Sequence, residues 1–270
     1  MAAVQHAPAT LAIPRIPVRR IAASDLRAVL REGYADFLDK RGDLLFVSLI
    51  YPLVGLVAAA VSLGGALLPL FFPIAAGIGL LGPIAAIGFY ELARRREAGL
   101  ESDWSHFLDV RKRPAFNSIM VVATLLLTIF VLWVAIAGAL YAALIGRAPT
   151  SIGDFLTLIF ATPQGWALIV AGNLVGLAFA ALVLSISVVS LPMLVDRDVG
   201  AADAIATSMR AVDANKWTMA RWGAIVAALL VAGSIPLFVG LAVVLPWLGY
   251  STWHLYTRLI DRSALPADAG

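Results

Sequence analysis

The chain contains no cysteine among its 270 residues. This absence excludes disulfide bonds, thiolate nucleophiles and cysteine-ligated metals, and it removes the side chain needed for palmitoylation or prenylation. Charge is also scarce, because Asp, Glu, Lys and Arg make up 14% of the residues, against about a quarter in soluble domains. Hydrophobic residues make up 61%. The composition therefore indicates a membrane protein rather than a soluble domain.

Sequence patterns of known catalytic chemistry are missing as well. The chain has no GxSxG, HExxH, P-loop or GxGxxG motif and no pair of aspartates inside an apolar stretch. Its three histidines lack metal-ligand spacing. Haem held across a bundle usually needs two axial ligands, and only His254 lies within an apolar stretch. We therefore expect no enzymatic activity, no catalytic or cofactor-binding residue and no metal site.

Six apolar stretches are present, and about 20 residues suffice to cross a hydrocarbon core of about 30 Å. They are residues 44–63, 70–91, 117–145, 166–192, 217–234 and 237–257. Eighteen of the twenty Lys and Arg residues lie before the first stretch, after the last, or at the connections of the second to the third and of the fourth to the fifth, and a nineteenth, Arg221, lies at the start of the fifth stretch on the same side. Only Arg147 lies at the opposite ends. Because positive residues stay cytoplasmic during insertion, both termini are expected in the cytoplasm.

The fold class predicted is an all-α polytopic membrane protein with six transmembrane helices arranged as three hairpins. Each hairpin is preceded by a short amphipathic segment, at residues 24–40, 102–110 and 202–212, which we expect to lie in the interface. These segments indicate either a threefold repeat or only the polar linker that each re-entry requires. We expect a flexible basic tail over 1–23, a membrane domain over 24–260 and a C-terminal tail over 261–270.

Two further regions carry structural expectations. The external segment between Pro149 and Pro163 has apolar residues at helical spacing and predicts a short surface helix. The stretch 166–192 contains Gly172 and Gly176, which favour close helix packing, and polar residues expected to bond across that contact. These polar residues are Asn173, Ser185, Ser187 and Ser190.

Ionisable residues gather at the cytoplasmic ends of the second, fourth and sixth stretches. The candidate cluster consists of Tyr90, Glu91, Arg94, Arg95, Asp196, Arg197, Asp198, His254 and Arg258. One interpretation is an ion-pair network that fixes the helix ends, and the other is a gate or a cytoplasmic docking site. We expect Glu91 and the segment Asp196–Asp198 to lie within salt-bridge reach of opposite charges from another helix end, with Arg258 or one of Arg94–Arg96 as the best partner. Glu97 is expected to be an isolated surface residue.

Three blocks of sequence resemble a family of bacterial integral membrane proteins known as domain of unknown function 2189. They are GPIAAIGFYELARRREAGLESDW at 82–104, SLPMLVDRDVGAADAIATSMRAVDANKWTMARW at 190–222 and WLGYSTWHLYTRLID at 247–261. The resemblance extends from about Asp25 to Ile260. It implies six helices in a bacterial inner membrane and implies no reaction. The signature positions that carry over are Glu91, Asp196, Arg197, Asp198, Trp253, His254 and Tyr256.

Taken together, these observations predict a multi-pass protein of the bacterial cytoplasmic (inner) membrane with N-in and C-in topology. The function expected first is a non-enzymatic accessory or scaffold protein of that membrane. The alternative is a small-molecule or ion transporter or channel. The positive charge lies beside helix ends, where anionic lipids account for it. The expected partners are therefore the lipid bilayer and, as a further candidate, another membrane protein, but not nucleic acid.

Overall fold

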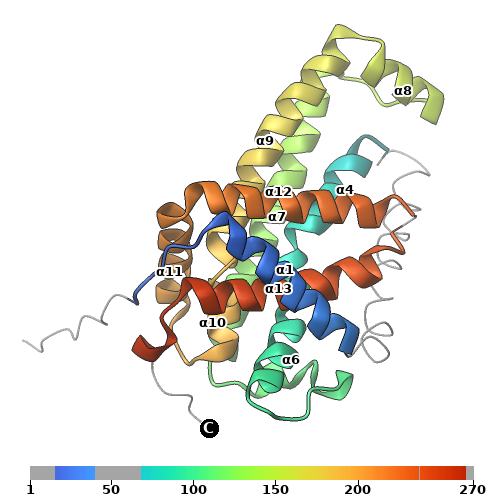
Figure 1. The fold of residues 1–270 in the computed structure, drawn as a ribbon. Helices are drawn as coiled ribbons and strands as arrows, with labels where there is room; N and C mark the ends of the chain where they lie inside the picture. The colour runs from blue at the N-terminus through green and yellow to red at the C-terminus, as the bar shows by residue number, and fades with distance from the viewer. Residues whose placement is uncertain (1–15, 40–67, 237, 266–270) are drawn as a thin grey trace, which may run out of the picture.

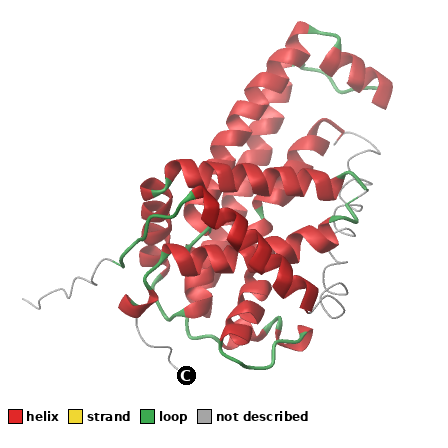
Figure 2. Ribbon diagram, in the orientation of Figure 1, coloured by secondary structure: helices red, strands yellow, loops and turns green. Residues whose placement is uncertain are grey.

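The computed structural model describes residues 16–39, 68–236 and 238–265. This part of the chain is helical, and extended backbone pairs in it only at an isolated bridge between Val18 and Ile260 (Figure 2). The α-helices are α1 (Ala23–Asp39), α4 (Phe71–Leu80), α5 (Gly82–Ala85), α6 (Ile87–Glu97), α7 (Phe116–Leu144), α8 (Ile152–Phe160), α9 (Pro163–Ser187), α10 (Ser190–Asp196), α11 (Ala201–Ala214), α12 (Lys216–Ser234) and α13 (Leu241–Leu259). Short 3-10 turns are η1 (Leu68–Leu70), η2 (Trp104–His106), η3 (Asp109–Lys112) and η4 (Arg262–Ala264).

Three helical segments in the described part are long and apolar enough to cross a membrane. They are α7, the continuous segment Pro163–Asp196 formed by α9 and α10, and α12. Helices α7 and α9 lie side by side and carry α8 at their far end, whereas α12 and α13 run across them (Figure 1). At about 1.5 Å per residue, the 29 residues of α7 extend about 43 Å, which exceeds the hydrocarbon thickness.

The other three predicted spans have different outcomes. The first, 44–63, lies outside the described residues. The second, 70–91, is not one continuous helix: α4, α5 and α6 succeed one another, with Pro83 in the first turn of α5, where proline is tolerated. The sixth forms α13, whose 19 residues include Pro246, His254 and Arg258. The polar His254 and Arg258 make α13 less apolar than the three candidate spans, so the six-span count stays a prediction.

Helix α1 forms where the sequence predicts an amphipathic helix, and it packs along α13. The buried face consists of Leu26, Val29, Gly33 and Phe37, so the expected apolar periodicity of residues 24–40 is confirmed. At the crossing, a Cβ added to Gly33 would lie 2.2 Å from Ser251 Oγ and 2.5 Å from the Ser251 backbone nitrogen. The absence of a side chain at residue 33 therefore permits this close approach.

Residues 16–22, which we expected in a flexible tail, pack against the helical body. Arg19 donates a backbone hydrogen bond to Leu259, and Asp261 donates one to Pro17. The buried Asn215 side chain accepts from the Ile21 nitrogen at 2.9 Å and donates to the Arg19 carbonyl at 3.1 Å. Backbone groups on either side of the predicted boundaries at 23 and 261 therefore pair with one another.

The three amphipathic segments are not equivalent. The first is a 17-residue α-helix, the second consists of the 3-10 turns η2 and η3, and the third is the 14-residue α11. The sequence predicts an apolar face of Ile205, Met209 and Val212 in α11, and this is partly wrong, because Met209 is exposed while small residues face the core. The buried residues of α11 are Ala204, Thr207, Ser208 and Ala211.

The expected polar contacts of the fourth span are wrong. Each of Asn173, Ser185, Ser187 and Ser190 donates to the carbonyl four residues earlier in its own helical segment. Gly176 lies against the Trp133 ring, but a Cβ at Gly172 would meet nothing within 4 Å. The polar contact between helices comes instead from Ser208, whose hydroxyl accepts from the Val189 nitrogen at 3.1 Å.

Candidate functional site

The ionisable ends of α6, α10 and α13 meet at one end of the molecule, together with α1 and the residues after α13. Arg262 contacts both Glu97 of α6 and Asp196 of α10. The Trp253 indole of α13 donates to Glu97 at 3.0 Å. The three ends that the sequence marks as charged therefore share one network, which we call the charged cluster.

Glu91 is the most deeply buried acid of the charged cluster. Its side chain is 1% exposed and accepts two hydrogen bonds from Arg94, at 2.8 Å from Nη2 and 3.0 Å from Nε. The recorded partner belongs to the same helix, three residues later. The partner is thus one of the expected residues, Arg94, but it belongs to the same helix and not to another helix end, because a two-pronged guanidinium on the same helix face reaches the carboxylate first.

Asp196 joins several elements at the end of α10. Its carboxylate accepts from the Tyr256 hydroxyl at 2.8 Å, and it lies 3.6 Å from Arg262 and 3.5 Å from Arg197. Its backbone carbonyl accepts from Arg113 at 3.1 Å. The carboxylate is buried, so its charge is balanced by polar groups rather than by bulk water.

The remaining candidate residues separate into two groups. Tyr90 is buried and hydrogen-bonded to Thr252 of α13, and Arg258 forms a bidentate pair with Glu32 of α1 at 2.6 and 2.8 Å. Arg95 lies outside the charged cluster and pairs with Asp109 at 3.6 Å. Asp198 is exposed, and no ion pair is recorded for it among the described residues.

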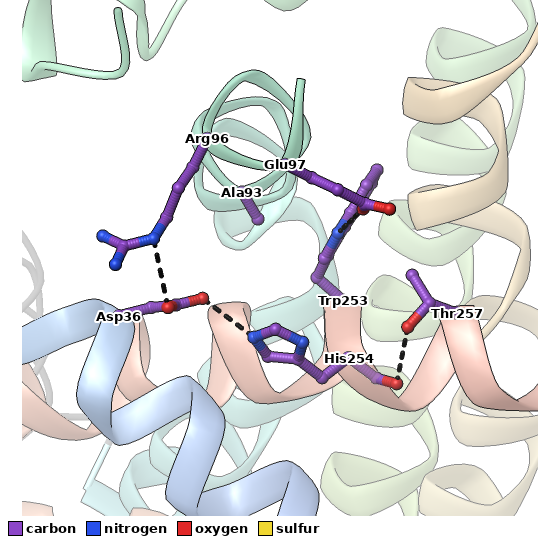
Figure 3. A pocket seen from close by; sticks show the side chains of 7 residues that line it. All are labelled: Asp36, Ala93, Arg96, Glu97, Trp253, His254 and Thr257. Carbon is purple, nitrogen blue, oxygen red and sulfur yellow. Dashed lines mark hydrogen bonds and ion pairs between the residues drawn. The ribbon is translucent and has the colours of Figure 1, made fainter. Parts of the chain in front are cut away.

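Residues of α1 take part that the sequence interpretation missed. Asp36 accepts from His254 at 2.8 Å and lies 3.2 Å from Arg96, which also reaches Asp39 at 2.7 Å (Figure 3). His254 Nδ1 lies 3.5 Å from Glu32. The sequence does contain a sign of these contacts: Glu32 and Asp36 are four residues apart and therefore lie together along the edge of the buried face of α1.

Glu97 is also paired, so its expectation as an isolated surface residue is wrong. Burial tends to raise the pKa of Glu97, but hydrogen bonds from Arg262 and Trp253 outweigh this and hold the pKa below 4.5. For Glu32, the Arg258 hydrogen bond is the largest influence and likewise holds the pKa below 4.5. Both carboxylates are therefore stabilised in their charged form.

We expect acid to weaken the charged cluster through these two carboxylates. Their folded-state pKa values lie below the unfolded value of 4.5, so their contribution to stability is fully present above about pH 4.5 and is lost as pH falls through the lowered values. Thermal unfolding in detergent at stepwise lower pH should show this loss, with a smaller loss in Glu32→Gln. The Glu32 side chain is 43% exposed, so its share should stay under about 1 kcal/mol.

The matched control for this titration is Glu101→Gln, because the Glu101 side chain is 88% exposed. This variant should keep the full acid dependence of the parent protein. An unfolding profile of Glu32→Gln that follows the parent at every pH would contradict the assignment of acid sensitivity to the pair with Arg258.

A pocket of about 360 Å³ opens beside the charged cluster, between α1, α6 and α13 (Figure 3). It is lined by Asp36, Ala93, Arg96, Glu97, Trp253, His254 and Thr257. The size lies at the lower end of the range for small-molecule sites. Glu91 and Asp196 are not among the residues that line this pocket. Neither buried acid therefore borders the space in which a ligand could bind.

One further group has the residue types of a metal site. Glu101, Asp103 and His106 place one ligand atom each within 4.8 Å of one another. The sequence argument considered only the spacing of histidines and missed this combination with carboxylates. His106 Nδ1 lies 2.7 Å from Asp109, whose carboxylate also contacts Lys112 and Arg95. The negative charge of the carboxylates in and beside this group is thus partly balanced by neighbouring basic side chains.

Residues 71–196 match the model of the DUF2189 family, which is described as a predicted integral membrane protein. The resemblance is thereby confirmed over that part of the chain. The match is shorter than the expected 25–260, so it includes Glu91 and Asp196 and leaves out Trp253, His254 and Tyr256. No curated protein and no solved structure matches the chain.

The match and the apolar helices agree on one conclusion. The protein is an integral membrane protein, and its outward-facing helices contact lipid. The match carries no reaction, so function has to be argued from the charged cluster and the pocket.

Proposed function

We propose that the protein is a non-enzymatic accessory or scaffold protein of the bacterial cytoplasmic membrane. The observation that carries the proposal is that the buried acids are satisfied internally. Glu91 is paired with Arg94, and Asp196 with Tyr256 and Arg262. Groups that already balance one another stabilise helix ends and are poorly suited to exchange a transported ion or proton. The amide of Asn173 and the hydroxyls of Ser185, Ser187 and Ser190 support this, because they donate to carbonyls of their own helical segment.

The proposal is tested by cross-linking in intact membranes before solubilisation in mild detergent. A scaffold should yield one membrane protein in a fixed ratio to the purified chain. The matched control is a preparation in which cross-linker is added only after solubilisation. Repeated purification of the chain alone, with its fold intact, would count decisively against a scaffold role.

A transporter remains the second candidate, and one observation favours it. The pocket brings Asp36, Arg96, Glu97 and His254 together beside the interrupted helices α4, α5 and α6, and interrupted helices line the binding sites of many transporters. Flux of a solute into proteoliposomes that is lost in Asp36→Asn but kept in Glu101→Gln would favour this function. We expect no such flux.

The topology proposed with this function is six spans with both termini in the cytoplasm. Reporter fusions after Arg113, Arg210 and Gly270 are expected to read cytoplasmic, because basic residues surround those points. Fusions near Gly65, Asp154 and Ser234 are expected to read external. A single clear reversal would refute the six-span arrangement.

A further inference from the structure

Helix α8 carries apolar residues on two adjoining faces. Phe155 and Ile159 are buried against Leu68 and Tyr141. Ile152, Leu156 and Phe160 are 52%, 45% and 55% exposed, and they follow one another at intervals of four residues. Packing within the chain therefore buries Phe155 and Ile159 but leaves the neighbouring apolar face of α8 exposed.

The polar residues of α8 occupy the opposite side. Each residue advances about 100° around a helix, so Thr157 and Asp154 project away from the arc that runs from Phe155 to Phe160. Asp154 is held there by a bidentate pair with Arg147 at 2.7 and 2.8 Å and by the Thr150 nitrogen at 2.9 Å. Helix α8 is therefore strongly amphipathic, and the pair with Arg147 fixes the position of the Asp154 carboxylate on its polar side.

The exposed apolar face of α8 continues onto α9. The Trp166 indole donates to the Phe160 carbonyl at 3.0 Å, and Trp166 is 55% exposed. It begins a stripe along α9 that continues with Val170, Leu174 and Leu177, which are 58%, 64% and 67% exposed. In an integral membrane protein such a stripe on a candidate span faces lipid. The same surface therefore turns the corner from α9 onto α8, where tryptophan typically marks the membrane interface.

We propose that α8 lies in the headgroup region of the bilayer at this end of the α7–α9 hairpin. Ile152, Leu156 and Phe160 then enter the boundary between headgroups and acyl chains, while Thr157 and Asp154 face water. The occupant of the exposed face is phospholipid. Because α8 is packed onto α7 and α9 through Phe155 and Ile159, its position in the headgroup region fixes how deeply the α7–α9 hairpin is inserted in the bilayer. Its position at the tip of the hairpin is visible in Figure 1.

The natural absence of cysteine makes the test direct, since each introduced cysteine is the only label site. Leu156→Cys and Thr157→Cys are neighbours on the same helix, and both native side chains are exposed. Each variant is spin-labelled and reconstituted in vesicles of phosphatidylcholine and phosphatidylglycerol. Collision rates are then measured with oxygen, which concentrates in the acyl region, and with a water-soluble nickel chelate. Phe160→Cys repeats the first measurement, and Val170→Cys provides the lipid-facing reference on α9.

Labels at 156 and 160 are expected to show a several-fold higher ratio of oxygen to nickel collisions than the label at 157, approaching the value at 170. If 156 and 160 collide with nickel as readily as 157, α8 stands in water and the proposal fails. If they are shielded from both reagents, a second protein surface covers them and the proposal also fails. Matching elution profiles and helical circular dichroism establish that the labelled variants are folded.

Discussion

Gly33→Ala is expected to lower stability by about 1–3 kcal/mol, the usual cost of overpacking a tight contact. The new Cβ would lie 2.2 Å from Ser251 Oγ, 2.5 Å from its backbone nitrogen and 2.7 Å from its Cα. A side-chain oxygen can rotate away, but the backbone of α13 cannot, so the two helices must separate. Melting temperature in detergent should fall, and trypsin should cleave faster after Arg27 and Arg31 as α1 detaches.

Gly172→Ala is the matched control, because it makes the same substitution in a helix where an added Cβ meets nothing within 4 Å. It should leave stability unchanged or raise it by up to about 1 kcal/mol, through the lower conformational freedom of alanine in the unfolded chain. Equal melting temperatures for the two variants would show that α1 and α13 are not as close as described.

The Gly33 contact also shows where sequence interpretation succeeds and where it ends. Large apolar residues at helical spacing predicted α1, and three of them, Leu26, Val29 and Phe37, are buried as expected. Tyr34, which fits the same spacing, is 41% exposed, and its neighbour Gly33 lies at the crossing of α1 and α13 instead. Periodicity identifies an apolar face but cannot show how closely a partner helix approaches, since that depends on the partner's own small residue, Ser251.

The charged cluster follows the same rule. The sequence placed three groups of charge at helix ends, and the helices bring those ends together through Arg262, which the prediction had assigned to a tail. The carboxylates of α1 were missed because α1 was expected to lie apart in the interface. Residue type and spacing thus predict which ends carry charge, while the pairing depends on long-range packing that spacing does not encode.

In α11 the cause of the error is side-chain size. Ile205, Met209 and Val212 mark an apolar face by hydropathy, but Ala204, Ser208 and Ala211 allow the closer contact and are the buried residues. Close packing of small residues and the hydrogen bond that the Ser208 hydroxyl accepts from the Val189 nitrogen favour this face over the more hydrophobic one.

Glu91→Gln is expected to have the largest effect, a loss of about 3–5 kcal/mol, the cost typical of breaking a buried ion pair. The Glu91 side chain is 1% exposed and the Arg94 side chain is 13% exposed. Little water therefore reaches the pair to compensate for the lost carboxylate charge. The measurement is thermal or denaturant unfolding in detergent at neutral pH. The matched control is Glu101→Gln, in which an 88% exposed carboxylate is neutralised and a change within about 0.5 kcal/mol is expected.

The double variant Glu91→Gln/Arg94→Gln separates a structural pair from a functional site. Removing both charges replaces the carboxylate and the guanidinium by two neutral amides, so the double variant should recover a large part of the stability lost in Glu91→Gln. If the pair serves only to hold the end of α6, association with a membrane partner should recover together with stability. A double variant that is folded as stably as the parent yet no longer associates would instead place Glu91 in a functional contact. A single variant as stable as Glu101→Gln would mean that water reaches Glu91, and the internal-pairing argument for a scaffold would then lose its basis.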